Sequence, residues 1–117
     1  MIEDNDADAA LLEILLSQVS ETRYEPLHAP TLQQGLDRGR DGAQVVLLDL
    51  YLPDAHGAAT LARSVAALGT LPVVVMSGLE GPVVAAQIAA SGARAWIPKS
   101  RFSPAALHEV LQRALAG

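Results

Sequence analysis

The sequence contains no cysteine and only four aromatic residues among 117, so its core must be aliphatic. Without cysteine, disulfides and thiolate metal sites are excluded. Basic residues are also few: the net charge is −5, which argues against nucleic-acid binding, because phosphate neutralisation needs a basic face. No apolar run approaches the roughly 20 residues of a membrane span. The acidic N-terminus lacks the layout of a signal peptide. We therefore expect a soluble cytoplasmic protein.

Strands and helices are expected to alternate along residues 1–117, which we interpret as a single domain. Residues 44–50 and 71–78 are apolar almost throughout, which indicates parallel strands covered by helices on both faces. Residues 93–97 form a third expected strand, and residues 24–29 a weak one at a sheet edge, because Pro26 cannot donate to a ladder. Apolar spacing, caps and terminal glycines predict helices over 8–20, from Thr31 to Gly39, through Leu61–Leu68 to Gly69, from Pro82 to Gly92, and from Pro104 onward.

The first strand of this α/β sheet is expected to be truncated. A helix at residue 8 should follow a central strand, but only Met1 and Ile2 precede the acidic cluster. We expect either that the true start lies upstream or that a neighbouring chain completes the slot.

Polar side chains follow each expected central strand. Glu3 and Asp4 follow the first, Asp49 the next, Ser77 the next and Lys99 the last. Ligands of open parallel sheets bind at the carboxyl ends of the strands, so these residues should share one edge. Three carboxylates without His or Cys favour Mg²⁺. A hydroxyl and an ammonium suit phosphoryl oxygens, and Asp49 is placed to act as the nucleophile that forms an aspartyl-phosphate.

Each of these residues alone has an ordinary structural explanation. An Asp after a strand is usually a turn or cap residue, Ser77 could be a loop hydroxyl, and Lys99 could be a solvated charge. The acidic run at 3–8 could simply be a helix N-terminus that matches the helix dipole. Their arrangement at one sheet edge is what favours a functional site.

These motifs together resemble a bacterial two-component response-regulator receiver domain, over essentially the whole chain. The acidic pair stands in IEDND and the phosphoacceptor in LLDLYLPDAHG, with Pro53 and Gly57 at the family's spacing. The hydroxyl stands in VVVMSG, and an aromatic residue and the lysine stand in GARAWIPKS. In the family the lysine is commonly followed by Pro, whereas here Ser100 follows.

The resemblance implies a flavodoxin-like, doubly wound parallel sheet of five strands in the order 2-1-3-4-5. It also implies phosphoryl transfer from a sensor histidine kinase to Asp49. Asp4, Asp49 and the backbone carbonyl of Tyr51 would then bind Mg²⁺ directly, and Glu3 through water. Ser77 and Trp96 would switch the face made by helix 4, strand 5 and helix 5.

The resemblance also gives roles to residues beside the phosphoacceptor. Tyr51 and Leu79 would flank the phosphoryl group and shield it from water, and Gly78 would leave the approach open to a donor histidine. The histidines show no metal-ligand spacing and no nucleophile partner, and we interpret them as surface or loop residues: His28, His56 and His108.

Two other functions compete with a phosphorylated switch. A degenerate receiver would dock or dimerise without taking phosphate. A true phosphatase on this fold would need a second acid two residues after Asp49, where Tyr51 stands, so an enzyme is not expected. For a switch, the expected partners are the kinase, an attached or separate output domain, and a second copy in a homodimer.

Overall fold

The computed structural model describes residues 1–39, 42–52, 54 and 58–117. Its helices are α1 (Asp6–Ser17), α2 (Leu32–Gly39), α3 (Ala58–Ala67), α4 (Pro82–Ala90) and α5 (Pro104–Ala116). Its strands are β1 (Val46–Asp49), β2 (Val73–Ser77) and β3 (Ala95–Pro98), and a short 3₁₀ helix, η1 (Lys99–Arg101), follows β3. Pro53, His56 and Gly57 of the expected phosphoacceptor motif lie outside the described residues.

The expectation of five strands is wrong for the described residues: three parallel strands form one sheet in the order β1-β2-β3. The other two expected strands are reduced to isolated bridges, in which Ile2 pairs in parallel with Ala29 on one side and with Leu48 on the other. Ile2 N–H donates to Leu47 O at 2.7 Å, and Asp49 N–H donates to Ile2 O at 3.0 Å. The segments that contain Ala29, Ile2 and Leu48 therefore lie side by side in the predicted order, but they are joined by single bridges.

Two features explain why these segments make bridges instead of strands. On one side, Ala29 N–H donates to Met1 O at 2.9 Å and the Met1 amine donates to Leu27 O at 2.7 Å. Pro26, the residue before Leu27, has no N–H to donate to a ladder. On the other side, Asn5 already caps α1 and its side chain accepts from Asp8 N–H, which ends the extended backbone after Asp4. The same cap places α1 at residues 6–17 instead of the predicted 8–20.

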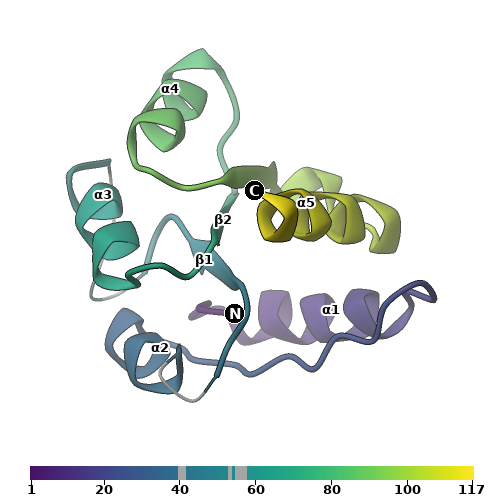
Figure 1. Ribbon diagram of the computed structural model, residues 1–117. Coiled ribbons are helices and arrows are strands. Elements are labelled where there is room, and N and C mark those ends of the chain that lie inside the picture. Colours follow the sequence, from purple (N-terminus) through teal and green to yellow (C-terminus); the bar gives the residue numbers. More distant parts are fainter. Residues whose placement is uncertain (40–41, 53, 55–57) are drawn as a thin grey trace.

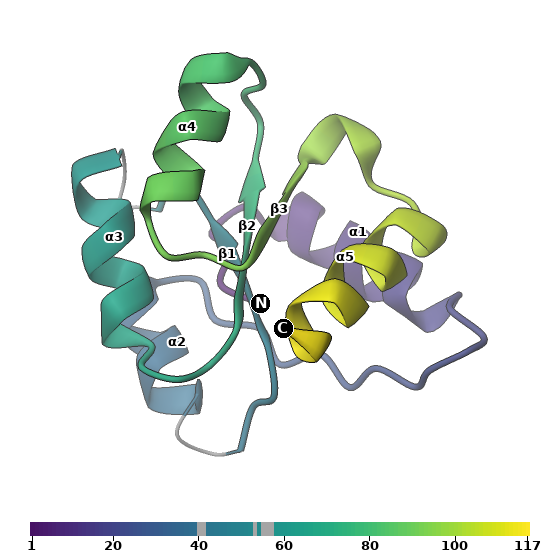
Figure 2. The same ribbon diagram turned by 45° about the horizontal axis from the view of Figure 1, so that its top comes forward.

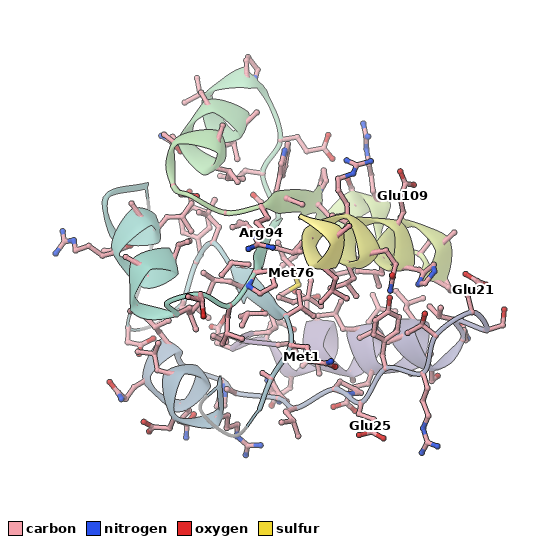
Figure 3. The ribbon with its side chains drawn as sticks, viewed as in Figure 1. Met1, Glu21, Glu25, Met76, Arg94 and Glu109 are labelled. Atoms are coloured by element: carbon pink, nitrogen blue, oxygen red, sulfur yellow. The ribbon has the colours of Figure 1, made fainter. Side chains whose placement is uncertain are left out.

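Helices cover both faces of the sheet, as the apolar strands predict. Figures 1 and 2 show α1 and α5 on one side and α2, α3 and α4 on the other. Successive strand residues alternate between the two cores, because side chains of a strand point to opposite faces. The α1–α5 core includes Leu12, Leu47, Val74, Met76 and Leu111, and Figure 3 shows Met76 in this interior. The opposite core includes Ile2, Leu48, Leu61, Val75 and Ile88.

The predicted helix boundary signals are largely confirmed. Gly69 and Gly92 follow α3 and α4 with φ of 68° and 89°, the left-handed conformation that glycine adopts most easily. Ser103 caps α5 by accepting from Ala106 N–H at 3.0 Å, with Pro104 in the first turn. Thr31 accepts from Gln34 N–H at 3.2 Å at the start of α2. None of the helices in the described ranges has both the length and the apolar character needed to cross a membrane.

Candidate functional site

The carboxyl edge of the sheet brings three carboxylates together. Asp49 is the last residue of β1, and the Ile2 bridge places Glu3 and Asp4 beside it. One ligand oxygen from each of Glu3, Asp4 and Asp49 lies within 4.8 Å of the others. Glu3 and Asp49 are buried, at 0% and 6% exposure, whereas Asp4 is exposed. Glu3 and Asp49 are therefore shielded from solvent, whereas Asp4 is accessible to it.

Lys99 reaches this cluster from the far side of the sheet, because β3 ends at Pro98 and η1 turns the chain toward β1. Its Nζ lies 3.0 Å from Glu3 Oε2 and 3.6 Å from Asp49 Oδ2. It lies nearer still, at 2.8 Å, to Asp8 Oδ2 in the first turn of α1. One ammonium thus faces three carboxylates from three segments of the chain.

Burial and charge repulsion change how Asp49 titrates. Burial first, and then the neighbouring Glu3 carboxylate, raise the pKa of Asp49 to about 7, although Lys99 acts in the opposite direction. Burial lowers the pKa of Lys99, but Asp8 and Glu3 outweigh it, so the pKa of Lys99 is raised and the group stays charged. Without a metal ion, the site therefore holds a charged ammonium beside a carboxyl group whose pKa of about 7 makes it lose its proton around neutral pH.

The carboxylate cluster fits a hard divalent cation. Its donors are oxygens only, the set that Mg²⁺ prefers. Glu3 Oε2 is fully buried and makes no hydrogen bond, so the Lys99 ion pair is its compensation within the described residues. A buried, incompletely satisfied carboxylate next to an open one is the arrangement that a partly hydrated cation would complete.

Ser77 lies at the end of β2 with no exposed surface, but its hydroxyl is used locally. Ser77 Oγ donates to Leu79 O at 2.8 Å and accepts from Leu79 N–H at 3.0 Å. The hydroxyl is placed at the predicted edge, and it must leave this local turn before it can bond a phosphoryl oxygen. The side chain of Leu79 itself is half exposed.

The residues expected to flank the site are exposed or unconstrained by packing. Tyr51 N–H is 3.4 Å from Asp49 Oδ1, and the Tyr51 side chain is 46% exposed. A Cβ added at Gly78 would meet nothing within 4 Å, so packing in the described structure does not require glycine there. The predicted flanking roles of Tyr51, Leu79 and Gly78 stay predictions, because these contacts do not place their side chains over Asp49.

Trp96 lies in β3, half-buried against the α2–α4 core. It also lines a pocket of about 380 Å³ together with residues at the start of α4 and in η1: Glu80, Gly81, Pro82, Ala85, Pro98 and Arg101. Ser100, which stands where the family commonly has Pro, donates to Glu80 across the same region. The Trp96 side chain therefore has open space beside it.

Two site contacts were missed by sequence reasoning. Asp8 was interpreted as a helix-dipole residue, yet it is the nearest partner of Lys99. His28 was interpreted as a surface or loop residue, but its Nε2 is 2.6 Å from Glu3 O, so it supports the backbone of the acidic pair. His108 is likewise bonded, with Nδ1 2.8 Å from Tyr24 OH. The position of the Asp8 side chain depends on where α1 begins, which the sequence analysis placed two residues too late.

Comparison with solved structures identifies the architecture. A two-component response regulator of the LuxR family from Aurantimonas aligns with a TM-score of 0.81 and 19% identity, over 99% of this chain and 82% of that one. The chemotaxis protein CheY4 from Vibrio cholerae aligns at 0.77 with 20% identity, over 97% of this chain and 94% of that one. The chain has the receiver fold.

A third receiver structure belongs to a longer protein. The N-terminal domain of a response regulator/sensory box/GGDEF three-domain protein from Carboxydothermus hydrogenoformans aligns at 0.74 with 22% identity, over 98% of this chain and 90% of that one. No protein-family model matches the sequence, and no curated protein matches it significantly. The receiver fold is therefore recognised at low sequence identity, through its three-dimensional arrangement.

Proposed function

We propose that this chain is a phosphoacceptor receiver domain of a two-component system, which takes a phosphoryl group from a sensor histidine kinase onto Asp49 with Mg²⁺. One observation carries the proposal. The carboxylates of Glu3, Asp4 and Asp49 gather within 4.8 Å, and Lys99 Nζ lies 3.6 Å from Asp49. The receiver fold of the structural neighbours supports it.

The chemistry follows from the placement of these groups. An ionised Asp49 oxygen attacks the donor phosphorus, so a new O–P bond forms while the P–N bond to the donor imidazole breaks. The imidazole leaves with that electron pair and takes up a proton. Lys99 offsets charge on the phosphoryl oxygens as they approach. Glu3, Asp4 and Asp49, with the Tyr51 carbonyl, would hold Mg²⁺, which supplies further positive charge when bound.

Phosphorylation of Asp49 would change the conformation of the domain through Ser77 and Trp96. Ser77 would exchange its Leu79 contacts for a phosphoryl oxygen. Trp96 would then shift beside the pocket at the start of α4, which alters the face formed by α4, β3 and α5. We propose that this face acts on an attached or separate output domain, or on a second copy of the chain, and that residues 1–117 form one cytoplasmic signalling domain and not an enzyme in their own right.

The direct test is intact mass after incubation with acetyl phosphate, with Mg²⁺ and with a chelator. We expect the wild-type protein to gain one phosphoryl group with Mg²⁺ and none with the chelator. The Asp49→Ala variant should gain none in either condition, whereas Glu13→Ala, which removes an exposed carboxylate of α1 outside the cluster, should behave like wild type.

Failure of this reaction would favour the second function. If wild-type protein folds and binds Mg²⁺ but takes no phosphate from acetyl phosphate, the chain would be a receiver that docks or dimerises without phosphorylation. Gain of phosphate that persists in Asp49→Ala would instead move the phosphoacceptor to another residue.

The flanking residues should slow hydrolysis of the phosphorylated protein. Tyr51 and Leu79 are large, largely apolar and half-exposed, and each follows a site residue by two positions, so we propose that they shield an acyl phosphate from water. Replacing both with small polar residues, as in Tyr51→Asn with Leu79→Ser, should shorten the phosphate lifetime by about tenfold, equivalent to roughly 1.4 kcal/mol in the barrier. Loss of phosphate can be followed by intact mass. Val83→Ser, an exposed apolar residue on α4, is the matched control, and an unchanged lifetime in the double variant would rule out shielding.

A further inference from the structure

Phosphorylation of Asp49 does not by itself explain why the Asp8 carboxylate lies beside Lys99. Lys99 is the only lysine in the sequence. Its Nζ lies 2.8 Å from Asp8 Oδ2 but 3.6 Å from Asp49 Oδ2. The ammonium is therefore closer to a carboxylate on α1 than to the one that would receive phosphate.

We propose that Asp8 is a positioning residue that holds the Lys99 ammonium away from Asp49 in the unphosphorylated protein. The inference rests on the proposed function in one respect: if Asp49 is phosphorylated, Lys99 must leave Asp8 to bind the phosphoryl group. It concerns a residue that acts through Lys99 and does not itself touch the reacting atoms.

Asp8 is well fixed for this role. Its backbone N–H donates to the Asn5 cap at 3.0 Å, which orients the first turn of α1. The next residue, Ala9, is buried, as is Leu12 one turn further, so the helix is anchored to the core. The Asp8 side chain is thus presented from a rigid element, and η1 brings Lys99 to it.

Burial decides which partner Lys99 would give up. Glu3 is fully buried, so loss of the ammonium would leave an unpaired charge without solvent. The Asp8 side chain is 34% exposed, and water can replace the ammonium at lower cost. Phosphorylation replaces the single carboxylate charge of Asp49 with a phosphoryl group that carries about two negative charges. The contact that breaks should then be the one with Asp8. The Asp8 ion pair therefore sets the resting position of the lysine.

The first arm of the test measures the freedom of Lys99 directly. Acylation by an N-hydroxysuccinimide ester is followed by peptide mapping in the free protein, with the N-terminal amine as internal reference. Because Lys99 is the only lysine, one modified side chain reports the pairing. We expect Asp8→Asn to be acylated about threefold faster than wild type, the size of effect given by a partly exposed ion pair. Asp8→Glu should retain slow acylation.

Asp6→Asn is the matched control, since it removes the same charge from the same turn at an exposed position. It should leave the rate near the wild-type value. Equal rates in Asp8→Asn, Asp6→Asn and wild type would overturn the inference.

The second arm measures the consequence at Asp49. The affinity for beryllium fluoride, a phosphoryl mimic, is measured with saturating Mg²⁺. Asp8→Asn should bind it about threefold more tightly, and most of this gain should disappear in the Lys99→Gln background. An equal gain in both backgrounds would show that Asp8 acts by charge alone and overturn its action through Lys99. If wild type binds no mimic while Asp8→Asn still accelerates acylation, the proposed function fails and the positioning of Lys99 stands.

Discussion

Replacing Lys99 with glutamine should lower the free energy of unfolding by about 3 kcal/mol in the presence of a chelator, because it leaves a buried charge unpaired. Glu3 is fully buried, and its Oε2 has the Lys99 ion pair as its compensation within the described structure. Asp49 and Asp8 lose the same ammonium. The measurement is the urea midpoint and slope, which give the free energy of unfolding.

Added Mg²⁺ should restore much of this loss, since a cation held by Glu3, Asp4 and Asp49 replaces the missing positive charge. Arg101→Gln is the control: it removes a cation from the same 3₁₀ helix at an exposed position and should change stability little. A Lys99→Gln protein as stable as wild type without Mg²⁺ would show that Lys99 does not stabilise the acidic cluster.

Replacing Asp49 with asparagine should stabilise the metal-free protein as pH rises. Burial and the Glu3 charge raise the pKa of Asp49 to about 7. Between the ordinary pKa of an aspartate, about 4, and this raised value, the folded state keeps a proton that the unfolded chain has lost. The contribution of the Asp49 carboxyl group to the free energy of unfolding is therefore fully present below about pH 4 and is lost as the pH rises to about 7. Asparagine keeps the shape without the charge.

The expected result is a difference between the two proteins that grows with pH. In chelator, Asp49→Asn should gain about 3 kcal/mol over wild type between about pH 4.5 and pH 7.5. With Mg²⁺ the order should reverse at the upper pH, because ionised Asp49 is a ligand and asparagine is a poorer one. Denaturant midpoints across this range test both signs, and a pH-independent difference would contradict the raised pKa.

The sequence by itself determined the layers of the fold and which residues lie at the carboxyl edge of the sheet. The apolar runs around Val46 and Val74 could only be strands covered on both faces, and their alternating side chains are divided between the two cores. Parallel strands end at one edge, so the positions of Asp49, Ser77 and Lys99 followed from strand order alone. Local signals such as Gly92 and Ser103 marked helix ends because backbone conformation and capping act over a few residues.

Tertiary structure decided the pairings, because these depend on contacts between distant segments. The predicted strand at 24–29 became a single bridge, since a ladder needs donors and a partner that the neighbouring segment does not supply. Ser77 is at the expected edge, but its hydroxyl bonds Leu79. Lys99 and Asp8 are far apart in sequence, and only the meeting of η1 with the first turn of α1 joins them. The order of residues along the chain placed the charges at one edge of the sheet, and packing determined which of them are buried and which side chains meet.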